Sequence, residues 1–215
     1  MSFLIVFLTI VAAVGSSVLF YSDSYVAILF LFTETDASSA GADDYWCQVA
    51  YRELSEHIGQ LFPVAARTID VFQHVAHGSG ISLSALHQHH LPKSDKVQSV
   101  RAKIGAGVTL SREGGTVWLY NRSMYAVFVT SYSLNIDNDC ADTWRVYKVN
   151  SGYAISVYDD EIMARWTPRL QPEDGPIDSK SIHISFVKGW GRDYRRQSVL
   201  NCACWLEILL NATNS

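Results

Sequence analysis

The chain has 215 residues, of which 48% are hydrophobic, and its formal net charge is −4. Such a length can build one substantial hydrophobic core, with or without an appendage. The net negative charge argues against a general nucleic-acid coat, so any basic binding site has to be local. Eleven Tyr, nine Phe and six Trp residues are typical of a β-rich domain.

Residues 1–32 are strongly apolar, and no Lys or Arg occurs before Arg52. The uncharged length is enough to span a membrane, but the basic flank of a signal peptide is missing. Three interpretations stay open: a signal peptide or anchor, a buried strand or helix, or a non-native start such as a mis-joined exon. Residues 33–43 are small, polar and acidic, which predicts a linker.

From Tyr45 to about Leu210 the composition is globular, and alternating apolar residues predict short strands. In the first half of this region we expect strands at 46–54, 57–64, 68–75 and 81–86, with a turn at 77–80.

Residues 93–105 predict a short amphipathic helix. Three apolar residues recur at spacings of three and four: Val97, Val100 and Ile104. Ser94 is expected to cap the start of the helix and Gly105 to end it. The polar face carries Lys96 and Lys103, with Arg101 near its edge.

The second half continues the strand pattern. We expect strands at 107–111, 116–120, 126–130, 144–149, 153–158, 181–186 and 200–210. Turns are expected at 112–115 and 150–152, and loops at 135–143 and 167–180. Residues 159–166 begin with three carboxylates that suit the start of a helix, where capping is their expected role. Many short strands with two short helices predict a β-sandwich with helical decoration.

A basic loop separates the last two predicted strands. Residues 188–198 hold two glycines, one tryptophan and four cations, which are Lys188, Arg192, Arg195 and Arg196. Arginine forks and a lysine on a rigid loop suit phosphate or carboxylate groups. A solvated hairpin loop has the same composition, so composition does not separate the two interpretations.

No set of residues predicts an active site or a cofactor. The histidine-rich stretch 87–90 lacks acidic or cysteine ligands at supporting spacing, so we expect a solvated loop and no metal. Serine nucleophile motifs are absent from the sequence. Gly105 and Gly107 lack the third glycine of a dinucleotide loop, and a helix stop is expected there.

The four cysteines bear on the cellular compartment: Cys47, Cys140, Cys202 and Cys204. The last two are expected on one face of a strand, where they cannot easily bridge each other. Reduced thiols favour the cytosol or nucleus. Glycosylation acceptor patterns at Asn121 and Asn211 matter only if the chain is secreted.

Segments 103–123, 183–197 and 202–211, in this order, resemble the Mad-homology 2 (MH2) domain of Smad proteins, and 44–62 fits its first strands. The resemblance spans residues 44–211 and leaves 212–215 as a short tail. It implies a mainly β, SMAD/FHA-type sandwich with a small helical bundle at one end and a loop-helix region at the other. It also implies that residues 188–198 form the specificity loop that meets phosphorylated partners.

Within the family the chain is most similar to the inhibitory Smads, because it stops soon after 205–210 without a Ser-x-Ser tail. In that branch a basic groove engages the activated type I receptor, and Lys103, Lys188 and Arg196 match its cationic positions. The chain departs from the pattern at Ser99, where a lysine is expected, although Lys96 lies about one further turn away. It departs again in the loop, where Asp193 and Arg195 lean toward the receptor-activated and common-mediator Smads.

The resemblance therefore implies a non-enzymatic regulator of TGF-β/BMP signalling in the cytoplasm and nucleus. Expected partners are a phosphorylated type I receptor, other Smads, and transcription factors or co-regulators, without direct DNA binding. The expected phosphoserine- or receptor-binding residues are Lys103, Lys188, Gly189, Trp190, Gly191, Arg192, Tyr194, Arg195 and Arg196.

Three alternatives stay open. The chain would be a Smad-type transcriptional co-regulator, a structural fragment that binds no phosphate, or a membrane-anchored or secreted binding module. The last requires residues 1–32 to be genuine, and only then is membrane contact expected. A glycan at Asn121 or Asn211 would favour it.

Overall fold

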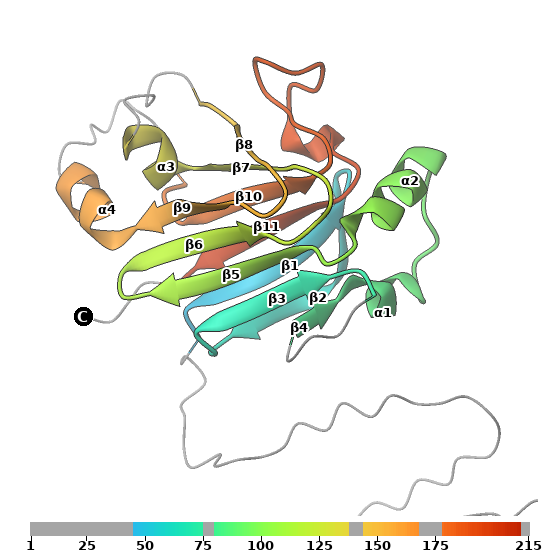
Figure 1. Cartoon of the computed structure of the whole chain (residues 1–215), viewed down its shortest axis with the longest axis horizontal. Helices are drawn as coiled ribbons and strands as arrows, with labels where there is room; N and C mark the ends of the chain where they lie inside the picture. Colours follow the sequence, from blue (N-terminus) through green and yellow to red (C-terminus); the bar gives the residue numbers. More distant parts are fainter. Residues whose placement is uncertain (1–44, 75–79, 138–143, 168–177, 212–215) are drawn as a thin grey trace, which may run out of the picture. The chain divides into compact units, whose positions relative to one another are not determined.

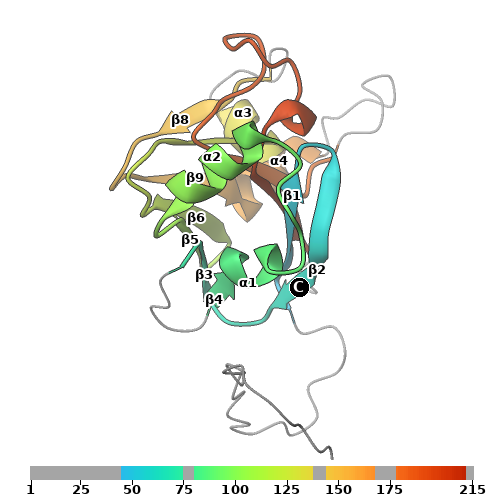
Figure 2. The same ribbon diagram turned by 90° about the vertical axis from the view of Figure 1, so that its right-hand side faces the viewer.

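The computed structural model describes residues 45–74, 80–137, 144–167 and 178–211. These residues form two β-sheets that pack as layers, with short helices at the ends (Figures 1 and 2). The apolar segment 1–32, the linker expected at 33–43 and the tail 212–215 lie outside the described residues. Among the helices that are described, none is long and apolar enough to cross a membrane.

The first sheet has six antiparallel strands. In spatial order they are β2 (Glu56–Val64), β1 (Cys47–Glu53), β11 (Trp205–Leu210), β10 (Ser181–Phe186), β7 (Val127–Ser131) and β8 (Tyr147–Val149). The pairing of β1 with β11 sets Cys47 opposite Leu210, so the two ends of the domain close on each other.

The second sheet has five strands, and only β3 and β4 run parallel. Their order is β4 (Gly80–Ser82), β3 (Thr68–Phe72), β5 (Val108–Glu113), β6 (Thr116–Asn121) and β9 (Ala154–Asp159). Gly107 precedes β5 with φ +65, and a Cβ there would lie 1.8 Å from the Val71 carbonyl oxygen. Only glycine allows this close approach of β5 to β3.

Apolar side chains of both sheets fill one core between the layers. Fully buried members are Val49, Ile184, Leu206 and Ile208 from the first sheet, and Val71, Val108, Leu110 and Leu119 from the second. Burying each of these side chains stabilises the fold by about 1.5–3 kcal/mol. The predicted mainly β sandwich is confirmed.

Helices lie at both ends of the sandwich (Figure 1). At one end α3 (Tyr132–Asp137) and α4 (Asp160–Trp166) pack through Tyr132, Ile136 and Met163. At the other end lies α2 (Asp95–Ile104). Ser94 Oγ accepts the Val97 N–H at 3.4 Å and Gly105 has φ +58, as predicted for the two ends of α2. Asp159 caps α4 by accepting the N–H groups of the two residues that follow Asp160.

Several predictions about single elements were wrong. The described residues hold four α-helices instead of two. The strand expected at 68–75 ends at Phe72, and β5 continues to Glu113 into the turn expected at 112–115. The strand expected at 81–86 ends at Ser82 and continues as α1 (Leu83–His87). Residues 135–137, expected to begin the loop 135–143, belong to α3. The strand expected at 144–149 begins only at Tyr147. The strand expected at 200–210 begins only at Trp205, after a 3₁₀ helix at Val199–Asn201.

The cysteines follow from this shorter last strand. Cys202 and Cys204 precede β11 instead of lying on its face, and both are fully buried, as is Cys47. The three are free thiols. Cys140 lies outside the described residues.

Arg101 is buried, with 7% of its surface exposed, and does not lie near the edge of a solvated face as the helical pattern predicts. Its Nε and Nη2 donate to the two carboxylate oxygens of Glu53 on β1 at 2.6 and 2.7 Å. The Tyr51 hydroxyl donates to the same carboxylate at 2.6 Å, and Arg101 Nη1 donates to the His90 carbonyl at 3.0 Å. This bidentate ion pair joins α2 to the first sheet.

His87 belongs to the same buried cluster, so the histidine-rich stretch is not simply a solvated loop as expected. Its Nε2 lies 3.1 Å from the Tyr51 hydroxyl and 3.3 Å from Glu53 Oε1. His89 and His90 are exposed. Within the described ranges no three His, Cys, Asp or Glu side chains gather as they would around a metal ion.

Replacing Arg101 by Met should strongly destabilise the fold. The substitution keeps the length of the side chain but leaves the Glu53 carboxylate buried without its cation, which typically costs about 3–5 kcal/mol. Chemical denaturation measures the free energy of unfolding. Lys96→Met, which removes an exposed cation of the same helix, should change it by less than about 0.5 kcal/mol. An equal effect of the two variants would contradict this role of Arg101.

Glu53 should make stability depend on pH. Burial raises its pKa, but the hydrogen bonds from His87, Arg101 and Tyr51 outweigh burial and lower the pKa from 4.5 to about 2. Because the folded-state pKa is the lower one, this stabilisation is complete well above pH 4.5 and is lost as the pH falls toward 2. Between these limits the free energy of unfolding should fall by about 3 kcal/mol more in the wild type than in Glu53→Gln. Parallel pH profiles of the two proteins would show that Glu53 is not the titrating group.

Candidate functional site

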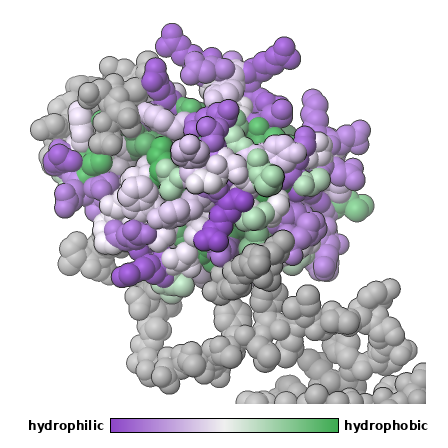
Figure 3. All heavy atoms as spheres, viewed as in Figure 1, coloured by the Kyte–Doolittle hydropathy of each residue, from purple (hydrophilic) through white to green (hydrophobic). Residues whose placement is uncertain are grey.

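The basic loop 188–198 connects β10 to the 3₁₀ helix before β11 and stands at the top of Figure 1. The space-filling view shows hydrophilic side chains projecting from the same part of the molecule (Figure 3). Lys188, Arg192 and Arg195 are exposed, and Arg196 is half-buried. Among the described residues none of these four cations forms an ion pair.

The loop begins with a strained turn. The Lys188 N–H donates to the Phe186 carbonyl at 2.8 Å, which closes a three-residue turn around Val187 at φ +68. Such a φ is rare for a β-branched residue and persists only where the surrounding contacts enforce it. Here Val187 N–H donates to the Ala126 carbonyl at 3.1 Å, and Ser185 Oγ donates to the Lys188 carbonyl at 2.8 Å. The backbone of Lys188 is therefore fixed on both sides.

Two aromatic side chains of the loop point inward. Trp190, 6% exposed, and Tyr194 pack with Phe128, Cys202 and Trp205 in a cluster separate from the main core. The rings of Tyr194 and Phe128 meet edge to face, with centroids 5.4 Å apart. The loop thus has its own apolar anchor within the domain.

The glycines of the loop have different roles. A Cβ on Gly189 would lie 2.6 Å from the Tyr194 ring, so Gly189 provides the space for that ring. Gly191 has φ +87, and its N–H donates to the Arg196 carbonyl at 2.7 Å. The bond closes residues 191–196 into a compact turn that presents Arg192 and Asp193 at its tip.

Arg196 lies near the root of the loop. Burial raises the pKa of the Cys202 thiol, and the hydrogen bond to Ser185 and the positive charge of Arg196 oppose that rise. The positive charge of Arg196 therefore reaches the buried thiol at the base of the loop. Arg196 itself is half-buried, so part of the residue remains accessible to solvent.

Lys103 reaches the same region from the last turn of α2. Its ammonium lies 5.7 Å from the ring centroid of Tyr125, and Ser123 Oγ donates to its carbonyl at 3.2 Å. Ser123 and Tyr125 belong to a short segment that ends at Ala126, and the Ala126 carbonyl accepts the Val187 N–H. Lys103 and Lys188 are thus on neighbouring elements, connected through one short segment. Ser99 and Lys96 are both exposed on α2.

Buried polar residues fix that segment, which the sequence did not indicate. Asn121, 2% exposed, donates from Nδ2 to the carbonyls of Tyr125 and Val149, both at 2.9 Å. Its Oδ1 accepts the Ser123 N–H at 2.9 Å. A glycan on Asn121 is incompatible with this fold, because the side-chain nitrogen that would carry it is buried and donates two hydrogen bonds. Asn121 therefore cannot serve as the marker of secretion that its sequence pattern suggested.

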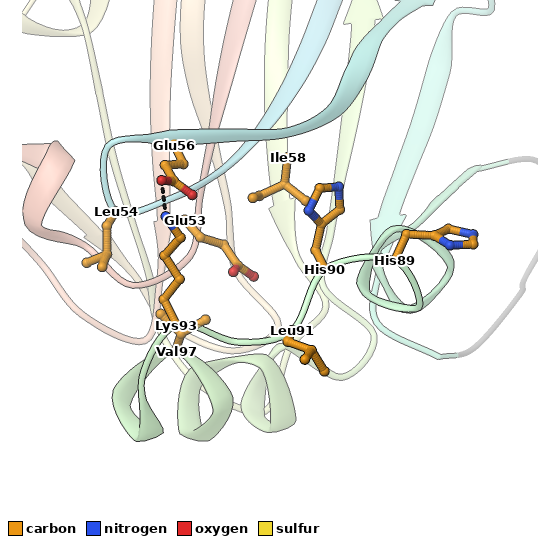
Figure 4. A pocket seen from close by; sticks show the side chains of 9 residues that line it. All are labelled: Glu53, Leu54, Glu56, Ile58, His89, His90, Leu91, Lys93 and Val97. Carbon is orange, nitrogen blue, oxygen red and sulfur yellow. Dashed lines mark hydrogen bonds and ion pairs between the residues drawn. The ribbon is translucent and has the colours of Figure 1, made fainter.

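A separate pocket of about 260 Å³ lies between the β1–β2 turn and the segment before α2. Figure 4 shows Lys93 extending across it to the carboxylate of Glu56, with which it forms an ion pair. Glu53, at its wall, is fully used by the Arg101 cluster described above. None of the residues expected to bind phosphate lines this pocket.

Substituting Gly189 by Ala should disorder the loop without unfolding the domain. The added Cβ would overlap the Tyr194 ring at 2.6 Å, and relief by moving that ring typically costs about 1–3 kcal/mol. Loss of protection of the Gly191 amide in hydrogen exchange would report the opening of the turn. Gln197→Ala, an exposed position in the same loop, is the control. Unchanged exchange in Gly189→Ala would refute the packing role of this glycine.

Comparison with known proteins places these elements in a family. The family model of the MH2 domain matches residues 44–211. The chain is 42% identical over 169 residues to Mothers against decapentaplegic homolog 6 from Gallus gallus and 39% identical over 177 residues to homolog 7 from Homo sapiens. These alignments cover 78% and 80% of this chain but only 38% and 40% of the relatives, so the chain spans about two fifths of their length.

A solved structure shares the fold at low sequence identity. The domain of interferon regulatory factor 9 called IAD matches with a TM-score of 0.53 and 8% identity, over 80% of this chain and 85% of that one. The match supports the two-layer β architecture only. The expected resemblance to Smad MH2 domains is confirmed by the sequence relatives, and the chain belongs to the MH2 domain family.

Proposed function

We propose that the chain is a non-enzymatic, inhibitory-Smad-like regulator of TGF-β/BMP signalling, acting in the cytoplasm and nucleus. Its basic loop, with Lys103, docks on phosphorylated type I receptor or on phosphorylated or common-mediator Smads. By occupying these phosphates it antagonises transcriptional signalling. The observation that carries the proposal is a preformed loop whose aromatic residues point inward while its cations, Lys188, Arg192 and Arg195, remain exposed.

A preformed loop lowers the entropy that docking must overcome, because few backbone torsions are left to order. Each charge-assisted hydrogen bond from a loop cation to a phosphate contributes about 1.5–3 kcal/mol. The exposed cations have no competing carboxylate in an ion pair within the described part of the chain. Docking should therefore depend on the phosphate and weaken at high ionic strength.

Similarity to Mothers against decapentaplegic homologs 6 and 7 supports the inhibitory branch. Partner choice then follows from the family resemblance: the cationic positions Lys103, Lys188 and Arg196 would meet phosphoserine groups of the receptor. Transcription factors or co-regulators would be further partners through the same domain, without direct contact to DNA.

The test is capture of the 215-residue chain by a type I receptor kinase domain, phosphorylated or unphosphorylated, at two salt concentrations. We expect capture only by the phosphorylated form, and weaker capture at higher salt. The double variant Lys188→Glu/Arg196→Glu should reduce capture by at least a hundredfold, because two attractions become repulsions.

The matched control is Arg67→Glu/Lys180→Glu. Both residues are exposed and lie at the far end of the first sheet, where Lys180 precedes β10. The control changes the net charge by the same amount and should leave capture unchanged. Capture that survives the loop variant, or that ignores phosphorylation, would overturn the proposed docking.

A further inference from the structure

A second pocket opens beside the tip of the basic loop and has a volume of about 290 Å³. It lies between the loop and the segment that leads into β8. The lining residues are Trp144, Arg145, Val146, Trp190, Arg192 and Asp193. Ligand pockets for drug-sized molecules hold about 300–1,000 Å³, so this one suits a single side chain with its neighbour.

The Arg145 wall rests on a buried polar support. Asn135 Oδ1 accepts the Arg145 N–H at 2.8 Å, and Thr130 Oγ1 donates to the Arg145 carbonyl at 2.7 Å. Asn135 and Thr130 are 1% and 6% exposed, and Asn135 Nδ2 also donates to the Ser131 carbonyl at 2.9 Å. The irregular segment before β8 is therefore held in one position, and Arg145 starts from a fixed backbone.

The apolar part of the pocket is equally fixed. Trp190 and Val146 belong to the small cluster that anchors the loop. Trp144 is 52% exposed, and its ring centroid lies 6.0 Å from that of Tyr132. One indole thus forms the buried side of the site, and a second presents an open face beside it.

The charges of the pocket favour an anion. Arg145 and Arg192 are exposed, and in the described part of the chain neither forms an ion pair. Asp193 is the single carboxylate among the lining residues, which leaves one excess positive charge. Guanidinium groups bind carboxylate and phosphate oxygens with paired N–H donors, and an open indole face suits a flat neighbouring group.

We propose that this pocket binds an oxyanion-bearing side chain, a carboxylate or a phosphate, in a peptide segment of a partner protein. Arg145 and Arg192 hold the oxygens, and a flat side chain next to the anion packs on Trp144. The proposal extends the docking function, on which it rests for the kind of partner. A peptide is favoured over nucleic acid because the site has two cations on a chain of net charge −4.

The test measures fluorescence anisotropy of three labelled peptides, Gly-Gly-X-Tyr-Gly-Gly, with the full chain. X is phosphoserine, glutamate or serine, which separates phosphate from carboxylate as the source of the anion. We expect either anionic peptide to bind at least tenfold more tightly than the serine peptide. Equal binding of all three peptides, or tighter Arg145-dependent binding of a labelled single-stranded oligonucleotide, would overturn the proposal.

Variants assign the binding to the pocket. Arg145→Gln should weaken the anionic peptide about tenfold, and Arg145→Lys less, since lysine keeps the charge but loses the fork. Asp193→Asn should strengthen binding, and Trp144→Leu should weaken all three peptides. Arg67→Gln is the matched control and should bind as the wild type does. Thermal unfolding verifies that each variant is folded, and wild-type affinity in folded Arg145→Gln would overturn the assignment.

Failure here and failure of the docking function are distinguishable. The variant Lys188→Glu/Arg196→Glu tests receptor capture and leaves both pocket arginines in place. Arg145→Gln removes a pocket residue outside the basic loop. Peptide binding that requires Arg145 while receptor capture is absent would leave the pocket assigned and overturn docking. Phosphate-dependent receptor capture with equal binding of the three peptides would support docking and overturn the pocket assignment.

Discussion

The buried ion pair between Glu53 and Arg101 is the contact on which the functional end of the domain depends. Both side chains are less than 10% exposed, and two hydrogen bonds join them. A carboxylate taken out of water is costly unless its partners replace the lost hydration. Arg101, Tyr51 and His87 together replace the lost hydration of the Glu53 carboxylate. The contacts fix the positions of β1, α1 and α2 relative to one another. Lys103 lies two residues beyond Arg101 on the same helix, and its position is a consequence of this pair.

A second constraint shapes the loop independently. The pairing of β10 with β11 sets Ser185 opposite Trp205, and these two residues flank the segment that holds the loop 188–198 and the 3₁₀ helix after it. Trp205 is 1% exposed and its indole nitrogen donates to the Leu54 carbonyl at 2.7 Å. The indole is therefore fixed at the base of the loop, where it packs in the cluster that holds Trp190 and Tyr194. Side chains within the loop fold back on this base, which leaves the cations to face solvent.

The sequence predicted what depends on local pattern. Period-two alternation located most strands, and the helix signals at Ser94 and Gly105 placed α2 correctly. It could not predict what depends on a distant partner. Arg101 looks like an ordinary polar-face residue until Glu53, 48 positions earlier, is known to meet it. The pocket beside Arg145 needs residues from before β8 and from the loop, which no spacing within either segment relates. Alternation also predicted the start of the last strand too early: Cys202 and Cys204 are buried, but β11 begins only at Trp205.

Polar side chains at the functional end are used for positioning, whereas its charges are left without partners. The side chains of Asn121, Asn135 and Ser185 are buried and form hydrogen bonds with the backbone of loop segments. Outside the loop, Arg52 and Arg112 each form an ion pair with a carboxylate, while the exposed cations of the loop form no ion pair with the described residues. An exposed unpaired arginine costs the folded state little, because water solvates it. Its guanidinium therefore stays available to an incoming anion, and because the backbone beneath it is already held in place, little order remains to be imposed on binding.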